Sequence, residues 1–219
     1  MHLPVKNSTT EVSVGTIKLP ADIAIPAQPM GLVLFAHGSG SSWLSSRNRM
    51  VADYLNRAGI ATVLFNLLTP AEDNDQRNRF NILLLAERLK MVTEWIADQE
   101  DCKHLRVAYF GASTGAAAAL VAASEMPAIA AVVSRGGRPD LAMQFLPSVK
   151  APTLLIVGSL DTEVITLNKQ ALEALHCEKH MALVTGATHL FEETGKMEQV
   201  CTLAAQWFEV HFQPVALTP

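Results

Sequence analysis

Residues 106–120 read Arg-Val-Ala-Tyr-Phe-Gly-Ala-Ser-Thr-Gly-Ala-Ala-Ala-Ala-Leu. An apolar segment comes first, two glycines then enclose Ser113, and an alanine-rich run follows. The apolar segment is typical of a buried strand, and the alanine-rich run favours a helix. We therefore predict a strand over Arg106–Phe110, a sharp turn over Gly111–Gly115 and a helix over Ala116–Ser124.

The rest of the chain alternates between short apolar segments and longer segments with helical periodicity, a pattern that predicts a parallel sheet. The expected strands are Glu11–Lys18, Gly31–Ala36, Ala61–Phe65, Ala130–Ser134, Thr153–Val157 and Met181–Val184. The expected helices are Arg47–Arg57, Phe80–Gln99, a short helix from near Asp140, Ile165–Leu175 and Met197–Phe212, with an exposed loop over Thr69–Asn78. We expect a single α/β domain over residues 1–219, with a mostly parallel central sheet, helices on both faces and little or no cap domain.

The amino-acid composition excludes several classes of protein. Apolar residues make up 49% of the 219 residues, charged residues 17%, and the net charge is −4 with both signs scattered, which argues against disorder and against a nucleic-acid partner. The odd number of cysteines, 3, favours reduced thiols over disulfides or a zinc site. Residues 1–6 show no secretory pattern, and the apolar runs are too short for a membrane span. We expect a cytoplasmic monomer or homodimer without a membrane partner.

A strand, a Gly-x-Ser-x-Gly turn and a helix in succession suit a catalytic serine. A serine hydroxyl is a weak nucleophile that must be held where a base can reach it, and a strained strand-to-helix turn does this. Ser113 is the candidate nucleophile. The alternative is that Ser113 and Thr114 only cap the helix, while a phosphate-binding loop would need a Gly-Lys-Ser/Thr ending that is absent here.

The base and the acid should follow the serine in the order Ser, Asp or Glu, His. His189, after the last expected strand, is the candidate base, and Asp161, after the strand Thr153–Val157, is the candidate acid. Asp140 is the rival acid, although a position as helix N-cap explains it better. Glu192 and Glu193 are expected at the rim of the site. The other histidines apart from His37 are expected at surface or structural positions: His2, His104, His176, His180 and His211.

Acyl transfer also needs N–H donors for the developing oxyanion. The backbone N–H of Thr114, directly after the nucleophile, should provide one. The sequence His37-Gly38-Ser39-Gly40 follows an expected strand, and Ser39 is the candidate second donor, with Gly40 as the other choice. We expect hydrogen bonds of His37 to brace this loop, and we include His37 and Gly40 among the candidate substrate-binding residues.

Two arginines, Arg135 and Arg138, lie in a glycine-containing loop after the strand Ala130–Ser134. Their guanidinium groups could bind a carboxylate or a phosphate of the substrate. Alternatively, they are solvated surface residues or partners of Glu72, Asp73 and Asp75.

Taken together, five segments resemble the dienelactone hydrolase family of α/β-hydrolases. They are Phe35–Gly40, Phe110–Gly115, Ser134–Asp140, Gly158–Asp161 and Gly186–Phe191. The resemblance extends over nearly the whole chain from about Gly31. It implies a triad of Ser113, Asp161 and His189 that hydrolyses an ester or lactone through an acyl-enzyme, without a metal or cofactor. Strict dienelactone hydrolases carry a cysteine nucleophile, so the serine of this chain favours a carboxylesterase.

The resulting expectation is a serine hydrolase that cleaves carboxylic esters of small or short-chain acyl groups. An open pocket, shaped by loops rather than by a cap domain, would favour such substrates. The alternatives are a lactonase of the dienelactone type, an acyltransferase and a non-catalytic, hydrolase-like binding module. For each of the catalytic functions, the expected partner is a small-molecule substrate, an ester or a lactone.

Overall fold

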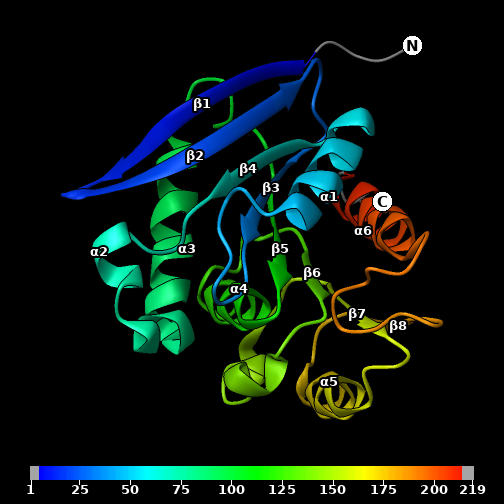
Figure 1. Ribbon diagram of the computed structural model, residues 1–219. Helices are drawn as coiled ribbons and strands as arrows, with labels where there is room; N and C mark the ends of the chain where they lie inside the picture. The colour runs from blue at the N-terminus through cyan, green and yellow to red at the C-terminus, as the bar shows by residue number, and fades with distance from the viewer. Residues whose placement is uncertain (1–4, 214–219) are drawn as a thin grey trace.

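The computed structural model describes residues 5–213 and consists of one eight-stranded sheet with helices on both faces (Figure 1). The strands are β1 (Val5–Val14), β2 (Ile17–Pro26), β3 (Leu32–Ala36), β4 (Ala61–Phe65), β5 (Val107–Ala112), β6 (Val132–Arg135), β7 (Thr153–Gly158) and β8 (Lys179–Val184). The helices are α1 (Ser46–Arg57), α2 (Pro70–Asp73), α3 (Ile82–Ala97), α4 (Thr114–Glu125), α5 (Thr162–Ala174) and α6 (Lys196–Phe212), with 3₁₀ turns η1 (Gln76–Phe80), η2 (Pro139–Ala142) and η3 (Leu146–Ser148). Residues 1–4, which include His2 and most of the segment inspected for a secretory signal, lie outside the described residues.

The strand order is β1-β2-β4-β3-β5-β6-β7-β8. The hairpin β1–β2 joins the sheet through β2, which is antiparallel to β4, and the remaining neighbours along the order β4-β3-β5-β6-β7-β8 pair in parallel. The carboxyl ends of β3, β5, β6, β7 and β8 therefore meet at one edge. In an open parallel sheet this edge is where ligands bind.

Two hydrophobic clusters cover the two faces of the sheet. Helices α3 and α4 contribute to one cluster, and α1 and α6 contribute to the other. The central strands β3, β4 and β7 are buried at every position, and β5 at every position after Val107, because helices cover both of their faces. The site thus lies at the carboxyl ends of the most buried strands.

The predicted α/β class is confirmed, and the central strands and long helices lie within a few residues of their expected positions. The strand expected over Glu11–Lys18 is wrong, since the chain reverses at Gly15 between β1 and β2. The expected loop over Thr69–Asn78 is also wrong. It folds into α2 and η1, and α2 begins with a capping box in which Thr69 and Glu72 satisfy each other's backbone N–H groups.

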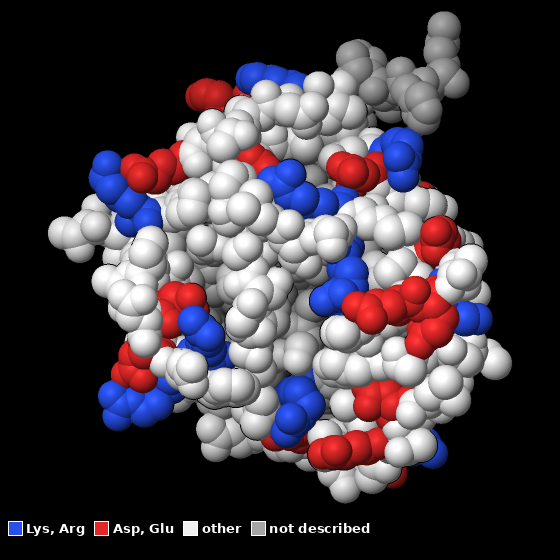
Figure 2. Space-filling view, viewed as in Figure 1, with Lys and Arg blue, Asp and Glu red and all other residues white. Residues whose placement is uncertain are grey.

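Over residues 5–213 the three cysteines are free thiols, and none of the helices is both long and apolar enough to cross a bilayer. On the face shown in Figure 2, basic and acidic side chains are interspersed rather than gathered into an extended basic stripe.

Candidate active site

The turn after β5 holds Ser113 in a strained conformation. Its φ of 51° and ψ of −121° are unusual for a residue with a Cβ atom. The strained conformation persists because the surroundings fix it: the Ser113 N–H donates to the Arg135 carbonyl at 3.3 Å, and the Ser113 carbonyl accepts from Ala116 and Arg138. Ser113 is thus presented at the start of α4, as in a nucleophile elbow.

The two glycines of the turn allow the backbone to pack closely. A Cβ atom on Gly111 would lie 2.4 Å from Ala116 Cα, and one on Gly115 would lie 2.2 Å from the Ala36 carbonyl oxygen. Real Cβ contacts are not this short, so any side chain would push α4 away from β3 and β5. The need for glycine here is steric.

Gly115→Ala is therefore expected to lower the free energy of unfolding by roughly 2–3 kcal/mol, the range of overpacking in a core. Urea unfolding followed by circular dichroism would measure this loss. The matched control is Gly15→Ala, because Gly15 has a φ of 58° but no atom within 4 Å of an added Cβ. The control should lose only about 1 kcal/mol from backbone strain, and a Gly115→Ala protein as stable as the wild type would contradict the steric argument.

The candidate acid and base form a direct contact. Asp161 lies between β7 and α5, His189 lies after β8, and Asp161 Oδ2 is 2.7 Å from His189 Nδ1. Backbone hydrogen bonds join the two loops, from the Leu160 N–H to the Ala187 carbonyl and from the Ser159 N–H to the Val184 carbonyl. When Nδ1 carries the ring proton and donates a hydrogen bond to Asp161, Nε2 is left as a proton acceptor.

Ser113 and His189 line one pocket of about 260 Å³ at the carboxyl edge of the sheet. Its lining residues are Gly38, Ser39, Ser41, Ser45, Arg47, Asn48, Ala112, Ser113, Arg135, His189 and Leu190. Within the part of the chain that the structure describes, Ser113 Oγ does not form a hydrogen bond with His189 Nε2. Such bonds are often long in a site without substrate and tighten in the Michaelis complex.

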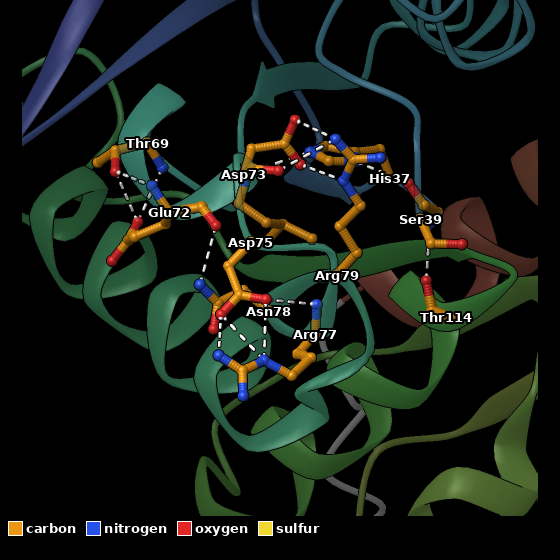
Figure 3. A network of polar contacts seen from close by, with 12 residues as sticks. His37, Ser39, Thr69, Glu72, Asp73, Asp75, Arg77, Asn78, Arg79 and Thr114 are labelled. Atoms are coloured by element: carbon orange, nitrogen blue, oxygen red, sulfur yellow. Dashed lines mark hydrogen bonds and ion pairs between the residues drawn. The ribbon is translucent and has the colours of Figure 1, made fainter.

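The two residues expected to donate to the oxyanion, Ser39 and Thr114, contact each other. Thr114 is the first residue of α4, so its N–H has no acceptor within the helix. The Ser39 N–H, by contrast, donates to the Thr114 hydroxyl at 2.8 Å (Figure 3). Gly38 approaches the nucleophile most closely on this loop, since a Cβ there would lie 3.1 Å from Ser113 Cβ. The Thr114 N–H is therefore available to bind an oxyanion, whereas the Ser39 N–H already donates to the Thr114 hydroxyl.

His37 braces the oxyanion loop and does not line the pocket. Its Nε2 accepts from the Leu67 N–H at 3.1 Å, and its Nδ1 lies 3.0 Å from the Gly38 carbonyl, to which it donates. Burial lowers the pKa of His37, which favours the neutral ring that this pair of contacts requires. Gly40, with a φ of 69°, shapes the same loop from outside the pocket lining.

The acidic residues of the α2–η1 segment form ion pairs with arginines of the same segment and of α3, and the Asp73–Arg79 pair lies near His37 (Figure 3). Asp73 pairs with Arg79, Asp75 with Arg77, and Glu72 with Arg88. These carboxylates are therefore not partners of Arg135 or Arg138. Arg138 pairs instead with Asp140 at 2.8 Å, outside the pocket lining, and Asp140 forms no side-chain N-cap.

Of the two candidate arginines, the structure brings Arg135 to the pocket and leaves Arg138 at the surface. The expected rim position of Glu192 fits its ion pair with Arg47, while Glu193 accepts from the Thr188 N–H beside His189. Sequence reasoning missed Arg47 and Asn48, which line the pocket from the start of α1. The four serines among residues 41–46, directly after the oxyanion loop, were the available signal for them.

Comparison with known proteins places this arrangement in a family. The model of the dienelactone hydrolase family matches residues 21–210. The chain belongs to the dienelactone hydrolase family. A solved dienelactone hydrolase from Anabaena variabilis is similar to this family member at 51% identity, with a TM-score of 0.93 over 95% of this chain and 99% of that one.

Two further relatives define how far the comparison extends. A Mycobacterium tuberculosis protein named "Putative phosphoribosyl transferase" is 52% identical over 95% of this chain, but this chain spans only 47% of it, about half its length. Est1E from Butyrivibrio proteoclasticus, solved with ferulic acid, shares 14% identity and a TM-score of 0.80 over 92% of this chain and 98% of its own. At that identity the likeness shows the α/β-hydrolase fold alone. This member of the dienelactone hydrolase family thus has the α/β-hydrolase fold.

Proposed function

We propose that this protein is a serine hydrolase that cleaves carboxylic esters of small or short-chain acyl groups through an acyl-enzyme on Ser113. The observation that carries the proposal is the Asp161–His189 contact of 2.7 Å beside a strained serine that lines the same pocket. A carboxylate, an imidazole and an accessible hydroxyl are the parts that nucleophilic acyl transfer requires.

Each residue has a defined task in this reaction. His189 Nε2 takes the proton of Ser113 as Oγ attacks the ester carbonyl, and Asp161 stabilises the imidazolium that forms. The Thr114 N–H and the positive end of α4 stabilise the oxyanion. His189 then gives the proton to the leaving alcohol, and a water molecule repeats the sequence on the acyl-enzyme. No group outside the chain and water is needed for these steps.

Labelling with a fluorophosphonate tests the proposal directly. The catalytic function requires covalent modification of Ser113, detected by mass spectrometry of the labelled peptide and lost in Ser113→Ala. Folded protein that remains unlabelled would instead support a non-catalytic binding module.

The size of the pocket predicts a preference for short acyl chains. About 260 Å³ is at the small end of ligand pockets, and none of the lining residues comes from the α2–η1 segment. We expect p-nitrophenyl acetate and butyrate to be hydrolysed with a kcat/KM at least roughly tenfold above that of the laurate ester, since the excess methylenes of laurate find little apolar surface to bury. A preference for laurate would refute the short-chain assignment.

A lactonase with the same triad is the second candidate, favoured by the 51% identity to a protein named dienelactone hydrolase. Parallel assays of small lactones and linear esters separate the two activities, since the better substrate class has the higher kcat/KM. The transferase name of the mycobacterial relative belongs to a protein about twice as long as this chain. Because the strained serine and the Asp161–His189 pair lie within residues 21–210, which the hydrolase family model matches, we propose hydrolysis for this chain.

A further inference from the structure

The two edges of the sheet, β1 and β8, differ in their side chains (Figure 1). Residues 6–11 of β1 are all polar and all exposed. The last four residues of β8, 181–184, are all apolar, and Leu183 is 50% exposed. Proteins normally protect a sheet edge with charges, proline or a bulge, because its unpaired backbone groups can bind another strand. The second half of β8 has none of these protections, so it is the edge that a further strand would fit.

The free backbone groups of β8 belong to alternate residues. The carbonyls of Glu178, just before β8, and of Val184, at its end, accept hydrogen bonds from N–H groups of the β7 segment. The even-numbered residues therefore turn their backbone groups toward β7, since the direction of these groups alternates along a strand. Lys179, Met181 and Leu183 turn theirs away from the sheet. Within residues 5–213 β8 pairs with β7 only, so these outward N–H and C=O groups are free to bind a further strand.

The pattern of outward donors and acceptors is complementary to itself. When two copies of β8 lie antiparallel about a two-fold axis at Met181, Met181 is opposite its own copy. Lys179 is then opposite Leu183 of the second copy. Opposed residues of this kind exchange both of their backbone hydrogen bonds, so every outward N–H and C=O of the three residues is satisfied. The contact uses the same surface on both copies, so it closes at a dimer and leaves neither β8 edge open.

A groove beside β8 extends the contact to side chains. It has a volume of about 600 Å³ and lies between β8 and α6. Apolar side chains of both elements line it, among them Ala182, Leu183 and Leu203. A second copy that pairs with β8 would shield these side chains from water, and removal of apolar surface from water is the main driving force of protein association.

The charged groups along the groove fit the same two-fold axis. The last turn of α6 lies at the start of β8, where His211 Nε2 is 3.4 Å from Glu178 Oε1. Glu198, in the first turn of α6, is therefore at the opposite end of the groove from His180. Because the axis reverses one copy relative to the other, each Glu198 carboxylate comes to the end at which the second copy places the His180 imidazole, a possible hydrogen-bond donor. Such complementarity selects the partner and its orientation.

We propose that the protein forms a homodimer in which two β8 strands pair antiparallel about Met181 and join the two sheets into one. A second copy of the chain fits this edge better than an unrelated strand, because both the backbone pairing and the charges match after a two-fold rotation. The inference does not depend on the proposed hydrolase function, since none of the residues that line this groove lines the pocket of Ser113.

Replacement of Leu183 by residues of opposite charge tests the pairing. Light scattering after gel filtration should give the wild type twice the chain mass of 23.7 kDa. Residue 183 lies opposite Lys179 of the second copy, so Leu183→Lys brings like charges together and Leu183→Glu brings opposite charges together. Half-exposed Leu183 tolerates both changes, which circular dichroism verifies. The dissociation constant of Leu183→Lys should be on the order of 10- to 100-fold above that of Leu183→Glu. A monomeric wild type, or equal dissociation constants of the two variants, overturns the proposal.

Cysteine cross-linking tests the position of the axis. Only the residue on the axis meets its own copy, so Met181→Cys should form an intermolecular disulfide with oxidised glutathione, since the Cα atoms of such a pair are about 5.5 Å apart. Lys179→Cys is the matched control, because its two copies would lie roughly 14 Å apart along the strands and should not cross-link. Both variants carry Cys177→Ser, which removes the free thiol nearest to β8 in sequence.

The products are resolved by non-reducing gel electrophoresis. Equal cross-linking of Met181→Cys and Lys179→Cys, or of neither, overturns the proposal. Light scattering and cross-linking both work without turnover. A cross-linked Met181→Cys dimer in a protein that a fluorophosphonate does not label would therefore support the dimer and refute the serine hydrolase, while a labelled monomer would do the reverse.

Discussion

Ser113→Ala is expected to lower kcat for p-nitrophenyl butyrate by roughly 10⁴- to 10⁶-fold, the loss typical of removing a nucleophile that acts together with its base. Without Oγ no acyl-enzyme can form, and the residual rate comes only from the oxyanion donors and the positioning of substrate. Alanine can occupy the same φ of 51° at a cost similar to that of serine, so the fold should persist. Initial rates measured with enzyme of verified purity, together with the thermal unfolding midpoint, check both statements.

The control for this variant is Ser124→Ala. Ser124 lies near the other end of α4, and its hydroxyl donates to the Val121 carbonyl within the helix. Loss of this local bond should leave hydrolysis near the wild-type rate. If Ser113→Ala retained more than about one-tenth of wild-type activity, a different nucleophile would have to be sought.

The features that could be predicted from sequence are those that local chemistry determines. The strand, turn and helix around Ser113 are such a case, because Gly111 and Gly115 are required by close backbone contacts within the turn itself and with β3. Strands covered on both faces are continuous apolar runs, which made β3 and β4 readable almost to the residue. Chain order sufficed to nominate Asp161 and His189, which the structure places 2.7 Å apart.

The features that were missed depend on tertiary context. In β1 nine of ten positions are at least partly exposed, so the strand carries little hydrophobic pattern, and its partner β2 contains Pro20 and ends at Pro26, residues that argue against a strand. The pocket residues Arg47 and Asn48 lie on a helix whose apolar periodicity identifies its buried side but not which end faces the site. Likewise, only the folded chain shows that Arg138 pairs with Asp140, while Arg135 forms no ion pair within residues 5–213.

Asp161→Asn has the second largest expected effect, a decrease in kcat of roughly 10²- to 10⁴-fold with KM changed much less. The carboxylate accepts a hydrogen bond from the His189 Nδ1–H and so favours the tautomer in which Nε2 carries no proton. An asparagine amide can turn its NH₂ group toward Nδ1, which moves the ring proton to Nε2 and leaves Ser113 without a base. The volume of the side chain is nearly unchanged, so the bonds between the two loops should hold the geometry.

The assay is steady-state hydrolysis of p-nitrophenyl butyrate as a function of pH, combined with the rate of fluorophosphonate labelling. Labelling of Ser113 should slow in parallel with kcat, because both reactions begin with removal of the same proton. Asp140→Asn is the matched control, since Asp140 is the other carboxylate considered for the acid and is paired with Arg138 outside the pocket lining. A larger loss in Asp140→Asn than in Asp161→Asn would reverse the assignment. Equal and small losses in both would mean that His189 acts without a carboxylate, and the 2.7 Å contact would then have only a structural role.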